Sequence, residues 1–359
     1  MGFLRANHSW AHVQIGIGNA LINKGHEVHF IPTDQGNCFP PELNKHLRKA
    51  PEPPYDLQLS YTAMHNFPAY LKYGSKNRFG IWNYESTVIP PNLVKYVNSC
   101  DLMLPASEFA KEVFLKNKIP ENKLAVIPHG INKEEYKTKE KYPLKTKASL
   151  KFCSNIAQPH IRKNIPGLFE AWGKAFTKKD DVCLVMKVVV KNFTKEDRVQ
   201  KFNVDFMKIF NKFKKKYPDH AEVELVKDFL PSMVPFYNAV DVMCSLTLAE
   251  CFWMPGLEAL ATDNIVLAPR YGGQLDFLND DNSILIEGKV GRAPRELQYW
   301  NASSYAEVFF PDVDDAADKM RHIYQNYDSL KEKFRPGMKK QVDLLTWDNV
   351  AGKILSLVV

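Results

Sequence analysis

Short, continuous apolar runs alternate along this chain with longer segments whose apolar residues recur at helical spacing. Residues 241–246 and 264–268 are two of these runs, and each predicts a strand that is buried on both faces. Between them, a loop leads into a helix that is expected to open at Pro255 or Gly256, because proline is favoured at the first helical position. Strand, helix and strand in this order predict a parallel sheet covered by helices.

The first part of the chain repeats this alternation. Strands are expected at residues 1–6, 27–32, 56–62, 79–86, 102–105 and 124–128, and helices at 11–24 and 91–99. Gly25 would cap the first helix, and Ser107 would cap a helix that follows the strand at 102–105. A strand, a helix and a second strand at the beginning are typical of a Rossmann-like domain, which binds ligands in the loops after its strands.

A polar, lysine-rich segment at residues 137–147 is expected to link this domain to a second one. There the pattern predicts further strands at 151–157, 182–190 and 223–226, and helices at 168–176, 233–240, 312–327 and 347–358. The chain is therefore expected to form one domain at residues 1–142, a second at 143–338, and a C-terminal helix at 339–359.

Two glutamates flank the loop and helix that follow residues 241–246. Glu258 lies in the first turn of the helix, where a carboxylate also complements the helix dipole. Glu250 lies at the end of the strand, where parallel sheets bind ligands. A helix N-terminus suits an anion, but two carboxylates would repel a bare phosphate. They suit a ligand that carries hydroxyls beside its phosphates, as a nucleotide sugar does.

The spacing of Glu250, seven residues and Glu258, with Pro-Gly-Leu directly before the second glutamate, resembles the signature of retaining glycosyltransferases of family GT4. The resemblance covers nearly the whole chain. It implies the GT-B fold, an α/β architecture of two Rossmann-like domains facing across a cleft, with a C-terminal helix that crosses back to the N-terminal domain. It also implies a hexosyltransferase (EC 2.4 type) that takes a UDP- or GDP-sugar as donor, retains the anomeric configuration and needs no metal or other cofactor.

The resemblance places most donor contacts in the second domain. Arg162 and Lys163, between a predicted strand and a predicted helix, would hold the donor diphosphate. Gln158 stands where these enzymes commonly have an arginine, so Arg162 is expected to substitute for it. Glu250 and His65 are expected to act in catalysis. The full set of expected donor contacts is Arg162, Lys163, Phe252, Trp253, Met254, Gly256, Leu257, Glu258, Phe229 and His129.

The acceptor is expected at the ends of strands in the first domain. Polar groups beside aromatic rings suit sugars, which present hydroxyls at their edges and C–H groups on their faces. The expected acceptor-side residues are Asn7, His8, Trp10, Trp82 and Glu85, and the acceptor itself would be a glycan or a glycoside.

Composition narrows the class of protein. The chain has 359 residues with a net charge of +7, and no apolar run approaches the length of about 20 residues that spans a membrane. A protein with this positive charge could bind nucleic acid, an anionic membrane face or anionic small molecules, but no nucleic-acid-binding motif is present. The six scattered cysteines and the lack of a signal peptide favour a cytoplasmic protein, with peripheral contact to an anionic membrane left open. The oligomeric state is not predicted.

Two alternatives stay open at this point. One is a GT-B enzyme of another type, a sugar-phosphate epimerase or a phosphorylase, although no lysine context for a phosphorylase cofactor is recognisable. The other is a catalytically inactive protein that binds a nucleotide sugar. Cys251 and Trp253 keep this second alternative open, because family GT4 commonly has small residues or glycine at those positions.

Overall fold

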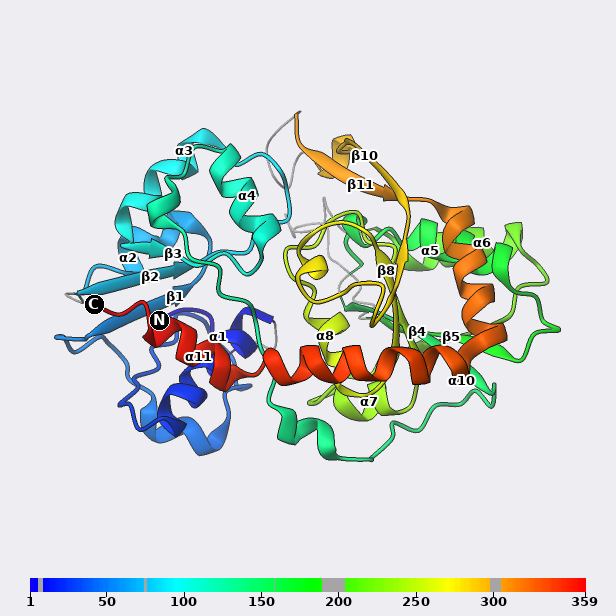
Figure 1. Cartoon of the computed structure of the whole chain (residues 1–359), viewed down its shortest axis with the longest axis horizontal. Coiled ribbons are helices and arrows are strands. Elements are labelled where there is room, and N and C mark those ends of the chain that lie inside the picture. The colour runs from blue at the N-terminus through cyan, green and yellow to red at the C-terminus, as the bar shows by residue number, and fades with distance from the viewer. Residues whose placement is uncertain (6–8, 74–75, 158, 189–203, 298–304) are drawn as a thin grey trace. The chain divides into compact units, whose positions relative to one another are not determined.

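The computed structural model describes residues 1–5, 9–73, 76–157, 159–188, 204–297 and 305–359 (Figure 1). The chain forms two compact units, each an α/β structure. One unit consists of Met1–Asn132 together with Asp343–Val359, and the other of Lys133–Val342. Within the part of the chain described, no helix combines the length and the apolar character needed to cross a membrane.

The first unit is built on a parallel sheet in the order β1 (Leu57–Tyr61), β2 (Asn77–Ile81), β3 (Leu102–Met103). Of the other strands expected here, those at 1–6, 27–32 and 124–128 are present only as isolated bridges, Gly2 to Pro32 and Met103 to Leu124. Pairing stops early at the beginning of the chain because the amides of Leu4 and Arg5 donate to the Asp34 carboxylate, at 2.8 and 2.9 Å, instead of to a neighbouring strand.

Helix α1 (Ser9–Asn23) packs closely against its neighbours in this unit because two of its glycines lack a side chain. It begins two residues before the predicted position, and α11 (Trp347–Leu355) lies against it. A Cβ at Gly16 would lie 2.4 Å from the Trp347 ring, and one at Gly18 would lie 2.4 Å from Phe30. The remaining α-helices described in this unit are α2 (Phe67–Tyr70), α3 (Pro91–Val94) and α4 (Glu108–Lys116). Ser107 caps α4 as predicted, accepting a 3.1 Å hydrogen bond from the amide of Ala110.

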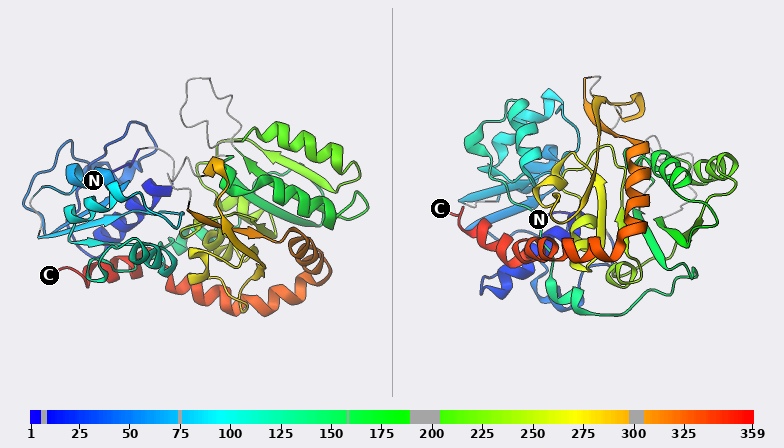
Figure 2. Two further views of the ribbon diagram at one scale, coloured as in Figure 1. Left: turned by 90° about the horizontal axis from the view of Figure 1, so that it is seen from above. Right: turned by 45° about the vertical axis from the view of Figure 1, so that its right-hand side comes forward.

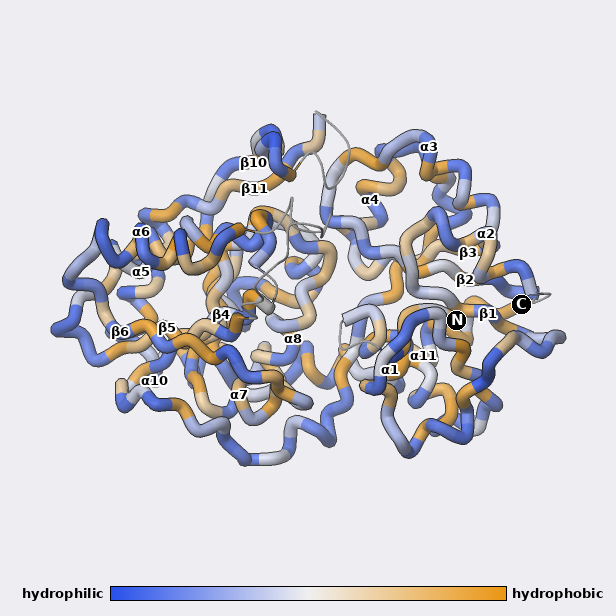
Figure 3. Tube along the Cα trace, turned by 180° about the vertical axis from the view of Figure 1, so that it is seen from behind, coloured by the Kyte–Doolittle hydropathy of each residue, from blue (hydrophilic) through white to orange (hydrophobic). Residues whose placement is uncertain are grey.

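The second unit contains a six-stranded parallel sheet in the order β6-β5-β4-β7-β8-β9. Its first strand in the chain, β4 (Leu150–Ala157), is central, with β5 (Val182–Val188) and β6 (Glu222–Val226) on one side. On the other side lie β7 (Val242–Cys244), β8 (Ile265–Pro269) and β9 (Ile284–Ile286). Strands β4 and β5 form a largely hydrophobic layer in Figure 3. Continuous burial of β5 and β8 explains why their sequences are apolar runs rather than alternating patterns.

Helices α5 (Ile165–Ala175) and α6 (Phe206–Lys216) cover one face of this sheet, and α8 (Met254–Ala261) and α10 (Val313–Leu344) lie on the other (Figure 2). A short helix, α7 (Val234–Asn238), precedes β7. Helix α6 was not predicted, although Phe206, Phe210 and Phe213 recur at helical spacing and pack against Phe169 at centroid distances of 5.9, 5.5 and 4.8 Å.

An antiparallel ribbon of β10 (Gly288–Arg292) and β11 (Glu307–Pro311) follows the sheet and was also not predicted. The segment expected as a linker packs onto the second unit: Tyr142 donates its amide to the carbonyl of Pro235 at 2.8 Å, and Thr146 donates its amide to Glu224 at 2.8 Å.

Candidate functional site

The candidate site of the second unit lies where its strand order reverses. After β4 the chain turns to α5 on one face, and after the neighbouring β7 it turns to α8 on the other face. Open parallel sheets bind ligands beyond the carboxyl ends of their strands at such a reversal. Arg162 and Lys163 follow β4 in a 3-10 helix, Ile161–Lys163, and Glu250 follows β7. Topology therefore brings these three predicted residues to one place.

Glu250 forms ion pairs with both cations. Its Oε1 lies 2.7 Å from Arg162 Nη1 and 2.6 Å from Lys163 Nζ, and the side chain of Glu250 is only 7% exposed. Burial alone would raise the pKa of the Glu250 carboxyl, but the charges of Arg162 and Lys163 outweigh burial and hold the pKa below its ordinary value. The carboxylate is therefore ionised at neutral pH.

Backbone hydrogen bonds fix the loops that carry this cluster. Leu248 donates its amide to the carbonyl of Arg162 at 2.7 Å, and Gly273 donates its amide to the carbonyl of Glu250 at 2.9 Å. Gly272 must be glycine, because its φ is +90° and a Cβ would lie 2.8 Å from the Glu250 carbonyl oxygen. The loop after β8 thus closes directly onto the backbone of Glu250.

Two side chains that the sequence did not single out support the cluster. His160 Nδ1 accepts a 3.1 Å hydrogen bond from the amide of Arg162. Burial and the charges of Arg162 and Lys163 lower the pKa of His160 to about 3, so its ring is neutral. Thr247 Oγ1 lies 3.1 Å from the Arg162 carbonyl and 3.3 Å from Glu250 Oε1. Histidine and threonine are common in loops, so only the fold shows that His160 and Thr247 converge on this cluster.

Glu258 has a different environment from Glu250. Its Oε2 accepts a 2.9 Å hydrogen bond from the hydroxyl of Tyr237, which in turn accepts one from Asn155 at 3.1 Å. Burial raises the pKa of Glu258 to about 7, and the negative charge of Glu135 adds to the rise. The two glutamates thus differ: Glu250 is ionised, and Glu258 changes its protonation state near neutral pH. Neither Tyr237 nor Asn155 belongs to a motif that would single it out in the sequence.

Helix α8 begins at Met254, earlier than the predicted start at Pro255 or Gly256. Trp253, the residue before it, is 5% exposed and has left-handed backbone angles, φ 70° and ψ 66°, which are costly for a tryptophan. Its indole lies beside Gly256, where a Cβ would be 2.3 Å from the ring. The indole of Trp253 therefore fills the space beside the Cα of Gly256.

The other residues of the second unit that were predicted to contact the donor differ in how deeply their side chains are buried. Phe252 and Leu257 are core residues, 2% and 0% exposed, and the Phe252 ring packs against Phe277 at a centroid distance of 5.1 Å. Met254 is partly buried at the first position of α8. Phe229 is 67% exposed in the loop after β6.

Trp10 and His129, two residues predicted in the first unit, lie on the same tyrosine. Trp10 stacks on Tyr61 at a centroid distance of 5.2 Å, and the His129 ring lies 5.7 Å from the same ring. His129 is 3% exposed and pairs with Asn83 at 2.7 Å. Burial lowers the pKa of His129 to about 3, so this histidine is neutral and suits hydrogen bonding rather than proton transfer at neutral pH.

The remaining predicted residues of the first unit are spread out. His65 is exposed in the 3-10 helix Met64–Asn66. Trp82 is 6% exposed and packs between Tyr84 and Phe114, at centroid distances of 4.6 and 6.2 Å, so its ring belongs to the core. Glu85 is partly buried. Asn7 and His8 lie outside the described residues.

This chain is similar to known proteins in structure, but no significant similarity in sequence was found. No model of a protein family matches the chain, and no curated protein is significantly similar to it. A glycosyltransferase from Rickettsia africae ESF-5 is similar with a TM-score of 0.71 at 16% identity, over 99% of this chain and 96% of that one.

Two further solved structures are similar over most of their length. Anabaena Alr3699/HepE, in complex with UDP-glucose, has a TM-score of 0.71 at 12% identity, over 99% of this chain and 97% of that one. Sucrose-phosphate synthase from Thermosynechococcus elongatus has a TM-score of 0.64 at 13% identity, over 95% and 90%. The predicted fold class is confirmed: over almost its whole length the chain has the GT-B fold of these glycosyltransferases.

Proposed function

We propose that this chain is a retaining hexosyltransferase of the GT4 type that moves a hexose from a UDP- or GDP-sugar to a glycan or glycoside acceptor. The observation that carries the proposal is the cluster of Arg162, Lys163 and Glu250 at the sheet reversal of a GT-B fold. The structure of Anabaena HepE contains UDP-glucose, which supports a ligand of this class for a similar fold.

The charges of the cluster suit the chemistry of glycosyl transfer. When the bond between the sugar and the diphosphate breaks, the diphosphate gains negative charge and the sugar becomes oxocarbenium-like. Arg162 and Lys163 would neutralise the leaving diphosphate, so neither a general acid nor a metal ion is needed for its departure. The ionised Glu250 would stabilise the positive charge on the sugar. These roles fit either attack from the same face or a double displacement.

Nucleotide release tests this proposal. The purified chain is incubated with UDP-glucose, UDP-N-acetylglucosamine and GDP-mannose, each with and without EDTA, and the free nucleoside diphosphate is measured. We expect release from at least one donor, at a rate that EDTA does not change, and a product that NMR shows to keep the anomeric configuration of the donor. Binding without release would favour an inactive nucleotide-sugar-binding protein, and an inverted product would exclude the GT4 type.

Replacing Lys163 by alanine is expected to weaken the binding of UDP or GDP at least about tenfold, equal to about 1.4 kcal/mol. The reason is the loss of one of the two cations beside Glu250. Isothermal calorimetry measures the affinity directly. Lys178→Ala is the matched control, because Lys178 pairs with Asp219 on the surface of the same unit. Equal affinities for Lys163→Ala and the wild type would remove Lys163 from the diphosphate site.

A further inference from the structure

One lysine of the second unit is buried without a partner. Strand β5 is buried at every position, and Lys187 is its only charged residue. Lys187 is 5% exposed, and its ammonium makes no hydrogen bond or ion pair with any residue that the structure describes. Burying a charge that has no partner is costly. A lysine in the middle of a parallel sheet therefore needs a reason other than packing.

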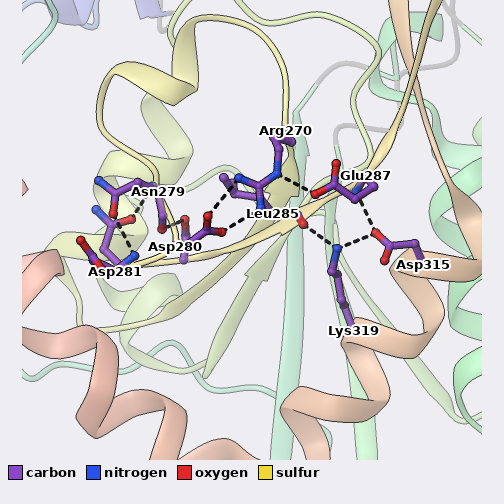
Figure 4. A network of polar contacts seen from close by, with 10 residues as sticks. Arg270, Asn279, Asp280, Asp281, Leu285, Glu287, Asp315 and Lys319 are labelled. Carbon is purple, nitrogen blue, oxygen red and sulfur yellow. Dashed lines mark hydrogen bonds and ion pairs between the residues drawn. The ribbon is translucent and has the colours of Figure 1, made fainter.

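Lys319 of the same unit shows how a lysine is normally satisfied. Its ammonium donates to the carbonyl of Leu285 and to the carboxylate of Asp315, at 2.7 Å each (Figure 4). It has these two partners although its side chain is 24% exposed. Lys187 is buried more deeply and has neither kind of partner among the described residues, so its ammonium is left for a ligand.

The strand register places Lys187 at the carboxyl end of the sheet. It lies opposite Asn155 of β4 and opposite Val226 of β6, so the three side chains share one face. Asn155 donates to the hydroxyl of Tyr237, which donates to Glu258. Lys187 is therefore on the same face of the sheet as Glu258, which is expected to bind the donor.

Asp228 offers an acceptor near this ammonium. It follows Val226 by two residues, and its charge opposes the effect of burial, which lowers the pKa of Lys187. Its Oδ2 accepts a hydrogen bond from the hydroxyl of Tyr142, whereas its Oδ1 has no hydrogen-bond partner in the described parts of the chain. Phe229, the next residue, is 67% exposed and offers a ring on which any nucleobase can stack.

We propose that Lys187 and Asp228 bind the lactam edge of the donor's nucleobase, uracil or guanine, an assignment that rests on the proposed nucleotide-sugar donor. A lactam edge presents a carbonyl oxygen beside an N–H group. An ammonium only donates hydrogen bonds, and a carboxylate only accepts them. Lys187 would donate to the carbonyl oxygen, and Oδ1 of Asp228 would accept from the N–H group.

The same two side chains disfavour other ligands. Adenine and cytosine present an amino group beside a bare ring nitrogen. Donor and acceptor are then exchanged, and both charged side chains would be left unsatisfied. A diphosphate would suit Lys187, but the carboxylate of Asp228 would repel it. A preference for lactam bases thus gives a reason for a lysine within an apolar strand.

Calorimetric titration of the full chain with UDP, GDP, ADP and CDP tests this assignment. The wild type is expected to bind UDP or GDP at least about tenfold more tightly than ADP and CDP, and the comparison of UDP with GDP identifies the base. Lys187→Met keeps an unbranched side chain and should weaken the preferred nucleotide about tenfold, with ADP and CDP unchanged. It should also raise the melting temperature, because it removes a buried charge that has no partner.

Lys227→Met is the matched control. This lysine directly precedes Asp228 and is exposed, so its replacement removes the same charge close to the same loop and should keep the preference for the base. Asp228→Asn changes an exposed residue, so it remains decisive if Lys187→Met does not fold. It should weaken UDP and GDP but not ADP and CDP.

Three results would overturn the assignment: equal affinity of the wild type for all four nucleotides, an equal loss for all four in Lys187→Met, or the same loss in Lys227→Met. The outcome is separate from that of the proposed function. A chain that releases nucleotide from its donors but binds all four diphosphates equally would be a transferase without this base site. A preference that depends on Lys187, in a chain that releases no nucleotide, would reject transfer and support the base site.

Discussion

Replacing Glu250 by glutamine is expected to lower kcat by at least about 100-fold, equal to about 2.7 kcal/mol of transition-state stabilisation. Glutamine keeps the shape of the side chain and removes the charge that opposes the positive charge developing on the sugar. An interaction that is made mainly in the transition state appears in kcat rather than in KM. The donor KM should therefore change much less than kcat.

The ion pairs of Glu250 add a second expectation for the same variant. In the wild type, Arg162 and Lys163 lie 2.7 and 2.6 Å from the Glu250 carboxylate, so an incoming diphosphate must share these cations with it. Glutamine leaves both cations without a buried counter-charge, which should destabilise the free protein by about 1–3 kcal/mol. A diphosphate would supply the missing negative charge. UDP or GDP should therefore bind Glu250→Gln at least as tightly as the wild type, and raise its melting temperature more.

Steady-state kinetics, calorimetry and thermal melting measure these effects together. Glu287→Gln is a suitable control, because Glu287 also pairs with an arginine, Arg270, but its side chain is 58% exposed. Wild-type kcat in Glu250→Gln would exclude Glu250 from catalysis. A large loss of nucleotide affinity would instead mean that Glu250 serves to hold the donor.

Much of the second unit could be predicted because its central strands are buried on both faces. Continuous apolar runs at residues 241–246 and 264–268 correspond to β7 and β8, and Glu250 lies in the loop that follows the first of them. The spacing to Glu258 then follows from one loop and one helical turn. The resemblance to GT-B enzymes rested on these same features, and the fold class is confirmed. The roles of the individual site residues remain predictions.

Structural features that depend on contacts between residues far apart in the sequence could not be predicted. Asn155 and Tyr237 meet Glu258 only because β4, α7 and α8 converge. Trp253 adopts a left-handed backbone conformation, which is found mostly in glycine. Burial of the indole offsets the conformational free energy that this backbone costs. The β10–β11 ribbon was missed because β10 has glycines at both ends of Lys289 and Val290 and lacks a clear alternation.

Replacing Glu258 by glutamine is expected to weaken donor binding about 30-fold, equal to about 2 kcal/mol, with a smaller change in kcat. We expect Glu258 to accept hydrogen bonds from the ribose hydroxyls, and bonds to a charged acceptor contribute about 1.5–3 kcal/mol. Tyr237 can still donate to the amide oxygen of glutamine, so the local packing is kept. Glu222→Gln, at the exposed start of β6, is the control, because its carboxylate also accepts a hydrogen bond from a hydroxyl, that of Thr146.

The raised pKa of Glu258 makes this prediction testable by pH. Because that pKa is about 7, the ionised fraction rises from about one tenth at pH 6 to about nine tenths at pH 8, and donor affinity should rise with it. Stability should change in the opposite direction. In the unfolded chain the pKa of Glu258 is near its ordinary value of 4.5, so the free energy of unfolding falls as pH rises from 4.5 to 7, by up to about 3 kcal/mol, and then levels off. Glu258→Gln should remove both trends and be the more stable protein at pH 8. Donor affinity that is independent of pH in the wild type, or equal melting temperatures of the two proteins at pH 8, would contradict this account of Glu258.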